Sequence, residues 1–240
     1  MLFLHQYVKI VSMKMPYETQ VDAQRAISRQ VHSYPLWTSG ELTAEKWEAF
    51  ALKMAAQYEV DISPSARQWR KKKGQCSAIL IGAEIPNREW GGRIRWVLMV
   101  TEKGDGAVKE KEKLKDARNA RIAWGDYVLM YMTRPREWGG GSRWTWCMSP
   151  QLERQESNFL TATAQSAALS NEPKRLDRFI RDSLMKRPMH SGIRTQTAKM
   201  LRRAQKVWAK HSRGKEWPSI DPDKLPIMTG YRRKETGSAA

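Results

Sequence analysis

The chain has 240 residues, 40% of them hydrophobic, which is enough for one large or two small domains with an apolar core. Its formal net charge is +18 at pH 7, and such an excess of cations favours a polyanionic partner over a basic surface that serves only solubility. No run approaches the roughly 18 apolar residues of a membrane span, and the two cysteines lack the spacing of a disulfide framework or zinc site, so we expect a cytoplasmic protein without membrane contact.

Residues 16–74 form an N-terminal region that the sequence predicts to be helical. Ala23, Ile27 and Val31 recur at every fourth position. After a predicted break at 34–40, Thr43 is a plausible N-cap for a second helix. The apolar stripe of that helix has the spacing of a core-facing face and consists of Trp47, Phe50, Ala51, Met54, Ala55 and Tyr58.

Residues 75–170 have the composition of a sheet domain. Four runs rich in apolar and β-branched residues predict strands at Cys76–Ile85, Arg93–Thr101, Tyr127–Thr133 and Arg143–Met148. We expect Trp96, Trp144 and Trp146, which lie inside these strands, to belong to the core.

A short repeat lies between the strands of each pair. The sequence Arg-Glu-Trp-Gly-Gly occurs at 88–92 and again at 136–140, 48 positions later, and an Arg-Trp pair follows each copy. Each copy stands where a hairpin connection belongs, and its glycines can adopt the positive φ of tight turns. The repeat predicts an α+β fold in which a duplicated ββα unit forms a four-stranded antiparallel sheet, flanked by N-terminal helices and a basic C-terminal helical region.

The basic helical region covers residues 171–214, and residues 215–240 are predicted to form an extended tail. Between Lys174 and Lys234 there are eighteen Lys+Arg against five Asp+Glu. A long helix is expected at about Ser191–Lys210, with a seam that packs on the domain. That seam is Ile193, Thr197, Met200, Leu201, Ala204, Val207 and Trp208.

A second row on this helix contains only cations and lies on a different face from the seam. Its members are Lys199, Arg203, Lys206, Lys210 and Arg213. A line of cations on a docked helix suits contact with a phosphate backbone. The alternative is an ordinary solvated face, although such a face usually alternates the sign of its charges.

Two further groups are candidate nucleic-acid contacts. The first is a cluster of five cations around a tryptophan: Arg67, Trp69, Arg70, Lys71, Lys72 and Lys73. The second comprises the two hairpin tips, with Arg88, Trp90 and Arg93 on one and Arg136, Trp138 and Arg143 on the other. The alternatives are a charged loop that guards a strand edge, for the cluster, and tryptophans that pack on the neighbouring glycines, for the tips.

Enzymatic interpretations have less support in the sequence. The four histidines share no metal spacing, and no glycine-rich phosphate loop is present, so we expect neither a metal site nor a cofactor. A metal-independent ribonuclease needs only a general base and a cationic stabiliser, and His190 or His211 could be that base.

The sequence therefore favours a non-enzymatic nucleic-acid-binding protein, with DNA preferred over RNA. We expect it to act in replication, transfer, transcriptional control or defence in a bacterium. One alternative is an RNA-binding or metal-independent RNA-processing protein within a ribonucleoprotein complex. Another is a structural subunit that docks on an acidic protein partner. If about five phosphates are neutralised, log affinity should fall against log salt with a slope of about −4 to −5.

Overall fold

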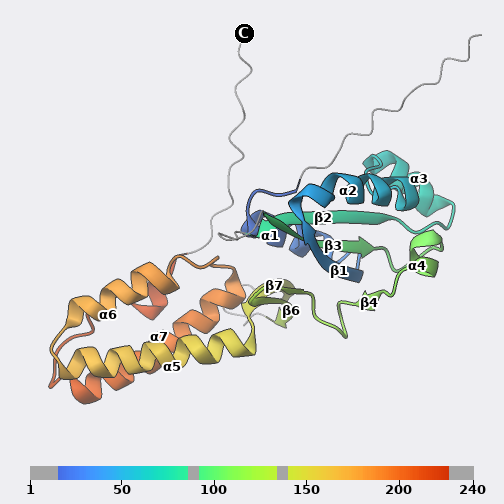
Figure 1. The fold of residues 1–240 in the computed structure, drawn as a ribbon. Coiled ribbons are helices and arrows are strands. Elements are labelled where there is room, and N and C mark those ends of the chain that lie inside the picture. The colour runs from blue at the N-terminus through green and yellow to red at the C-terminus, as the bar shows by residue number, and fades with distance from the viewer. Residues whose placement is uncertain (1–15, 86–91, 134–139, 227–240) are drawn as a thin grey trace, which may run out of the picture. The chain divides into compact units, whose positions relative to one another are not determined.

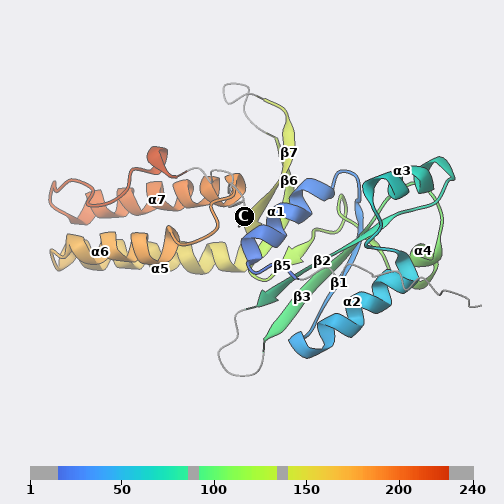
Figure 2. The same ribbon diagram turned by 90° about the horizontal axis from the view of Figure 1, so that it is seen from above.

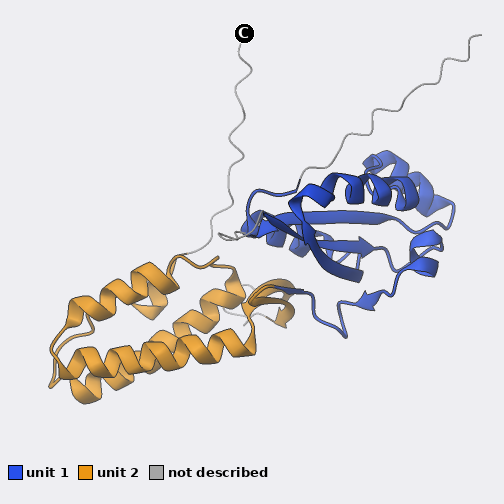
Figure 3. Ribbon diagram, in the orientation of Figure 1, with its two compact units in different colours: residues 1–124 blue, residues 125–240 orange. Residues whose placement is uncertain are grey.

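The computed structural model describes residues 16–85, 92–133 and 140–226. The chain divides into two compact units, residues 1–124 and residues 125–240 (Figure 3). The fold is α+β, as predicted, with seven α-helices and a four-stranded antiparallel sheet among the described residues (Figure 1). The division between the units falls inside the region 75–170, which the sequence analysis treated as one sheet domain.

Unit 1 contains the four-stranded sheet, with strand order β2-β3-β1-β4. Its elements in chain order are α1 (Gln20–Gln30), β1 (Leu36–Thr43), α2 (Ala44–Tyr58), α3 (Pro64–Lys72), β2 (Ala78–Ile85), β3 (Arg93–Val100), α4 (Ala107–Lys111), β4 (Lys115–Asp116) and β5 (Ala123–Trp124). Helix α2 contacts β1, β2 and β3, whereas α1 contacts β2. Strand β2, at an edge of the sheet, and its neighbour β3 are mostly apolar and buried, as expected of strands that are covered on both faces.

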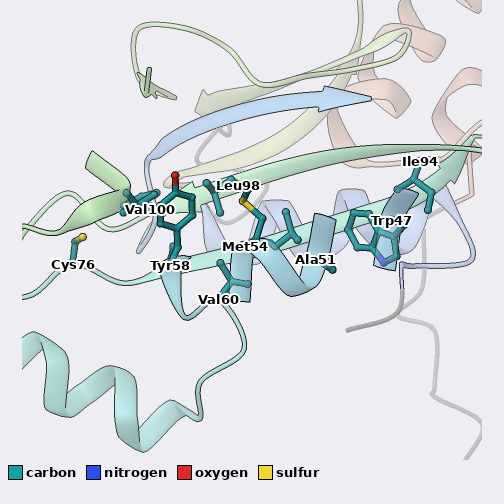
Figure 4. Packing of buried hydrophobic residues seen from close by; sticks show 12 residues of the cluster. Trp47, Ala51, Met54, Tyr58, Val60, Cys76, Ile94, Leu98 and Val100 are labelled. Carbon is teal, nitrogen blue, oxygen red and sulfur yellow. The ribbon is translucent and has the colours of Figure 1, made fainter. Parts of the chain in front are cut away.

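The core of unit 1 lies between α2 and one face of the sheet (Figure 4). The predicted stripe of α2 is confirmed, because Trp47, Ala51, Met54 and Tyr58 are buried and the other two stripe residues pack against them. The facing strand residues alternate along β2 and β3, as the two-residue period of a strand requires. Thr43 does precede the helix, but its side chain makes no capping hydrogen bond.

Strand β1 corrects the predicted break at 34–40. Leu36–Thr43 pairs along its whole length with β3 and lies inside the sheet rather than in a turn. Gly40, which resembles a turn former in the sequence, is needed because Trp96 lies over it: a Cβ atom at Gly40 would be 2.7 Å from the indole ring. The local sequence could not reveal this, since the contact joins residues far apart in the chain.

Unit 2 is built on a hairpin and a pair of long helices. Its elements are β6 (Tyr127–Thr133), β7 (Ser142–Met148), α5 (Pro150–Leu169), α6 (Pro173–Phe179), the π-helix η2 (Ile180–Leu184), α7 (Ser191–His211) and the 3₁₀-helix η3 (Pro222–Lys224). The second sheet has the strand order β5-β6-β7. Helices α5 and α7 lie side by side in both views (Figures 1 and 2).

The long C-terminal helix is confirmed as α7, within one residue of its predicted end. Its predicted seam is buried, apart from a half-buried Val207. At its N-terminus, the backbone N–H of Gly192 donates to the hydroxyl of Thr145 at 3.1 Å, so that β7 caps the helix. A Cβ atom at Gly192 would lie 2.4 Å from Cys147 Sγ and 2.5 Å from the carbonyl oxygen of Trp146. The glycine therefore allows the close approach of α7 to β7.

The two copies of the repeat join antiparallel strand pairs, β2–β3 and β6–β7, as predicted for hairpins. Most of each tip, 86–91 and 134–139, lies outside the described residues. The two hairpins belong to separate sheets, and β1 and β4, rather than the second hairpin, complete the four-stranded sheet. Each hairpin has its own covering helices, α1 and α2 for the first and α5 and α7 for the second, so neither needs the other to bury its apolar residues.

Candidate nucleic-acid interface

Four cations form an exposed line along α7, which we call the α7 row: Lys199, Arg203, Lys206 and Lys210. Their spacing of four, three and four residues keeps them on one face of the helix. The buried seam occupies a different face, so packing holds the helix while the row faces solvent. The helix contains no Asp or Glu, and its row therefore has no acidic neighbour within the helix.

No residue of the α7 row forms an ion pair within the described part of the chain. Other cations of unit 2 are neutralised locally, in the pairs Arg175–Glu172, Arg181–Asp177, Lys186–Asp182, Arg187–Glu156 and Arg202–Asp223. Burial alone would raise the pKa of the Asp177 carboxyl, but hydrogen bonds from Ser219 and Arg181 lower it. In the described part of unit 2, the α7 row is thus a group of exposed cations without acidic partners.

A shallow hollow adjoins the row where α5 packs against α7. It has a volume of about 240 Å³, and its walls include Lys199 and Arg203 from α7 and Arg154 from α5. The hollow also contains Glu153, whose carboxylate accepts a hydrogen bond from the Gln196 amide at 2.8 Å. Arg154 therefore places a further cation beside the row.

Arg213 does not continue the row, although the sequence grouped it with the other four. Helix α7 ends at His211, and Arg213 has a positive φ of 53° in the turn that follows. A residue in this left-handed conformation leaves the helical spacing on which the grouping depended. Arg213 is exposed, but the geometric row consists of four residues.

The cationic cluster of unit 1 lies on α3 and the residue that follows it. The helix forms because Ser63 caps its N-terminus, accepting a hydrogen bond from the Ala66 N–H at 3.2 Å, and Pro64 occupies its first turn. Trp69, Lys71, Lys72 and Lys73 are exposed, and the Trp69 side chain keeps 56% of its surface in contact with solvent.

Two cations of this cluster are engaged inside the protein. The guanidinium of Arg67 donates to the carbonyl oxygen of Val60 at 3.1 Å, and Arg70 pairs with Glu59. The ammonium group of Lys73 lies 3.7 Å from the centroid of the Trp69 ring, a cation–π contact. Arg67 and Arg70 thus anchor α3, which leaves Lys71 and Lys72 as the freer cations.

The hairpin tips can be followed only at their base. Arg88, Trp90, Arg136 and Trp138 lie outside the described residues. Arg93, at the start of β3, lies 3.4 Å from a Glu41 carboxylate oxygen, and Arg143 is half-buried in β7. Contact between the tips and nucleic acid stays a prediction.

An aromatic pair on the second hairpin was not predicted as a site. Tyr131 of β6 is 59% exposed and lies opposite Trp144 of β7, with the ring centroids 5.3 Å apart. Trp144 is half-buried, unlike Trp146, which is fully buried as predicted. The alternation of Tyr127, Leu129 and Tyr131 places the three residues on one face, but sequence alone does not show where that face ceases to be covered.

The histidines offer little to a catalytic interpretation. His190 is only 8% exposed, at the N-terminus of α7, and His211 is half-buried at its other end. Across the described ranges, no three His, Cys, Asp or Glu residues form a group that could hold a metal ion. Nor does any described helix combine the length and apolar character needed to cross a bilayer.

Comparison with known proteins did not identify a relative: no protein-family model, curated protein or solved structure matches the chain.

Proposed function

We propose that this chain is a non-enzymatic nucleic-acid-binding protein that contacts the phosphate backbone through the α7 row. The proposal depends on one observation: four exposed cations lie in line on a helix without acidic residues, and none has an ion-pair partner in the described chain. Unpaired cations of this kind attract a nucleic acid, and their contact with its phosphates releases the counterions that had condensed on the nucleic acid.

The dimensions of the row suit a run of phosphates. Lys199 and Lys210 are eleven residues apart, which is about 16 Å at the helical rise of about 1.5 Å per residue. One DNA strand presents a phosphate about every 3.4 Å along the axis, so the row spans about five of them. With four cations engaged, log affinity for duplex DNA should fall against log salt with a slope of about −3.6.

The test is a binding panel of duplex DNA, single-stranded DNA and RNA, measured by filter retention over a range of salt concentrations. In the row variant, Lys199, Arg203, Lys206 and Lys210 are all changed to glutamine. We expect duplex affinity at low salt to fall at least about tenfold, and the salt slope to become shallower by about 3.6.

A matched control removes four exposed cations that are already paired: Arg175, Arg181, Lys186 and Arg202 are changed to glutamine. This variant has the same net charge as the row variant, so it should keep most of the affinity if the position of the charge matters. Equal weakening of the two variants, or binding that ignores salt, would contradict the proposal.

The same panel separates the other interpretations. DNA is the first ligand to test, and a clear preference for RNA would favour the ribonucleoprotein alternative. Cleavage of a hairpin RNA in EDTA, lost on His211→Ala, would make the protein an enzyme. Salt-independent binding to an acidic protein, without affinity for any nucleic acid, would favour a structural subunit.

A further inference from the structure

Helix α3 differs from an ordinary surface helix, because a mostly polar stripe of it lines a cleft of unit 1. None of its residues is fully buried. Pro64, Arg67, Gln68 and Lys71 follow the i, i+3, i+4, i+7 pattern in which a core-facing helix carries apolar side chains. These four residues line a cleft of about 430 Å³.

The other walls of the cleft come from three separate segments of unit 1: residues 32–35 after α1, Gln75 and Ser77 before β2, and residues 101–103 after β3. Lys103 therefore lines the cleft from a different segment of the chain than Arg67 and Lys71, which lie on α3. The acidic residue of the lining is Glu102, and its carboxylate lies 2.5 Å from Arg118. The lining thus carries three cations and one carboxylate that already has a partner.

Two of the cations are available to a ligand. Lys71 and Lys103 make no ion pair or side-chain hydrogen bond to any described residue. Arg67 keeps one hydrogen bond, to the carbonyl oxygen of Val60, which fixes its guanidinium at the wall. Cations on two walls suit the dianionic head of a phosphomonoester, which offers three acceptor oxygens.

Contacts between the segments 75–77 and 101–104 hold two walls of the cleft together. The hydroxyl of Thr101 accepts from the N–H of Ser77 at 3.0 Å and donates to the carbonyl oxygen of Lys103 at 3.1 Å. Gly104 has a φ of +85°, and a Cβ atom there would lie 2.5 Å from the backbone of Gln75. These contacts tie two walls together without a ligand, so binding would spend little free energy on ordering them.

We propose that this cleft binds a phosphomonoester the size of a mononucleotide. Its volume lies within the range of about 300–1,000 Å³ that is typical of small-molecule sites, well beyond what a lone phosphate ion requires. Lys71, Lys103 and Arg67 would bind the phosphate. The amides of Gln68 and Gln75 and the hydroxyl of Ser77 would form hydrogen bonds with the organic part. The ligand is either a free nucleotide or the phosphorylated end of a nucleic-acid strand.

Isothermal titration calorimetry of the full chain with AMP tests the proposal, with adenosine as the probe that lacks the phosphate. AMP should bind at least about tenfold more tightly than adenosine, because adenosine lacks the phosphate that the cations of the cleft would bind. Failure of AMP to bind, or equal affinity for AMP and adenosine, would overturn the proposal.

Two neighbouring lysines provide the matched comparison. Lys71 lines the cleft, whereas Lys72 is exposed on the same helix and lies outside the lining. Lys71→Gln should weaken AMP binding about tenfold, and Lys72→Gln should leave it within about twofold. Both side chains are exposed, so neither change should alter the urea midpoint. Equal loss in the two variants would mean that only net charge matters, and the cleft would not be the site.

The source of the phosphate is decided with oligonucleotides in the α7-row variant, so that backbone binding does not interfere. Displacement of AMP by a 5′-phosphorylated oligonucleotide, but not by its 5′-hydroxyl counterpart, identifies a strand end as a ligand of the cleft. Binding of AMP alone identifies a free nucleotide. AMP affinity should survive in the row variant, which separates this proposal from that for α7.

Discussion

Tyr58, the last residue of α2, links that helix to Glu112, the residue that follows α4. Its hydroxyl donates to the Glu112 carboxylate at 2.6 Å, and the ring is buried in the core of unit 1 (Figure 4). Burial, together with the adjacent carboxylate, raises the pKa of Tyr58 from 10.0 to about 12. The sequence predicts that Tyr58 belongs to the apolar stripe, but not that a glutamate 54 positions later accepts a hydrogen bond from its hydroxyl.

This shift predicts a pH-dependent contribution to stability. Because the pKa is higher in the folded state, the protonated phenol stabilises the fold fully below pH 10, and the contribution is lost as the pH rises toward 12. Tyr58→Phe should therefore be less stable than the wild type below pH 10 in urea denaturation, with a difference that shrinks above it. Tyr131→Phe, at an exposed ring, is the control, and a Tyr58→Phe difference independent of pH would contradict the assignment.

The cationic cluster on α3 shows that the sequence predicts which residues are cations but not which of them have partners inside the protein. The sequence identifies Arg67 and Arg70 as cations but not as the residues that anchor the helix, because their partners Val60 and Glu59 are set by the path of the preceding loop. The cleft beneath α3 likewise needs residues from four segments of the chain. Neither follows from periodicity.

At the scale of elements, helices with one apolar face were predictable. The stripe of α2 and the seam of α7 each repeat over several turns, so the pattern survives any local exception. Strand β1 was not predictable, because its one glycine is required by an indole on another strand. The row on α7 was predicted correctly up to Lys210, and the error at Arg213 arose because the helical spacing was continued beyond the end of the helix, where Arg213 has a positive φ.

The second hairpin, β6–β7, leads to a prediction that depends on the proposed function. Tyr131 and Trp144 expose aromatic surface in a unit with unpaired cations, and aromatic rings stack on unpaired bases. Tyr131→Ala should weaken binding to a single-stranded oligonucleotide about fivefold or more, since stacking contributes about 1–3 kcal/mol per base. Fluorescence anisotropy is the measurement.

Two controls isolate stacking from charge. Tyr131→Phe keeps the ring and should bind like the wild type. An abasic oligonucleotide of the same length keeps the phosphates but has no bases, so its affinity should be insensitive to Tyr131→Ala. If Tyr131→Ala weakens binding to the abasic strand as much as to the normal one, the aromatic pair is not a stacking site.

For the whole molecule, the two units differ in how much positive charge they carry in excess. Residues 125–240 carry 22 Lys+Arg against 11 Asp+Glu, whereas residues 1–124 carry 21 against 14. The sequence predicts the larger excess of positive charge in the C-terminal region, because this requires only a count of charged residues. It does not predict that the hairpins belong to different sheets, because both have the same repeat and the same strand pattern.

Gly192→Ala tests whether the units are independent. The added Cβ would overlap Cys147 and the backbone of Trp146, and overpacking of this kind costs about 1–3 kcal/mol. Hydrogen exchange measured by mass spectrometry should accelerate in α7 and β7, with no change in α2, β2 and β3. Gly92→Ala, where a Cβ would make an ordinary 3.6 Å contact, should leave both units unchanged. Equal acceleration throughout the chain would mean that the units unfold as one.

The duplicated segment also provides an internal comparison. Trp96 and Trp144 occupy the same place in the repeat, 48 residues apart, but Trp96 lies over Gly40 beside Phe50, while Trp144 faces an exposed tyrosine. The same indole thus joins a sheet to a helix in one copy and has a solvent-facing neighbour in the other. Matching positions of the repeat therefore contribute differently: one tryptophan packs against the core of its unit, and the other leaves aromatic surface open to solvent.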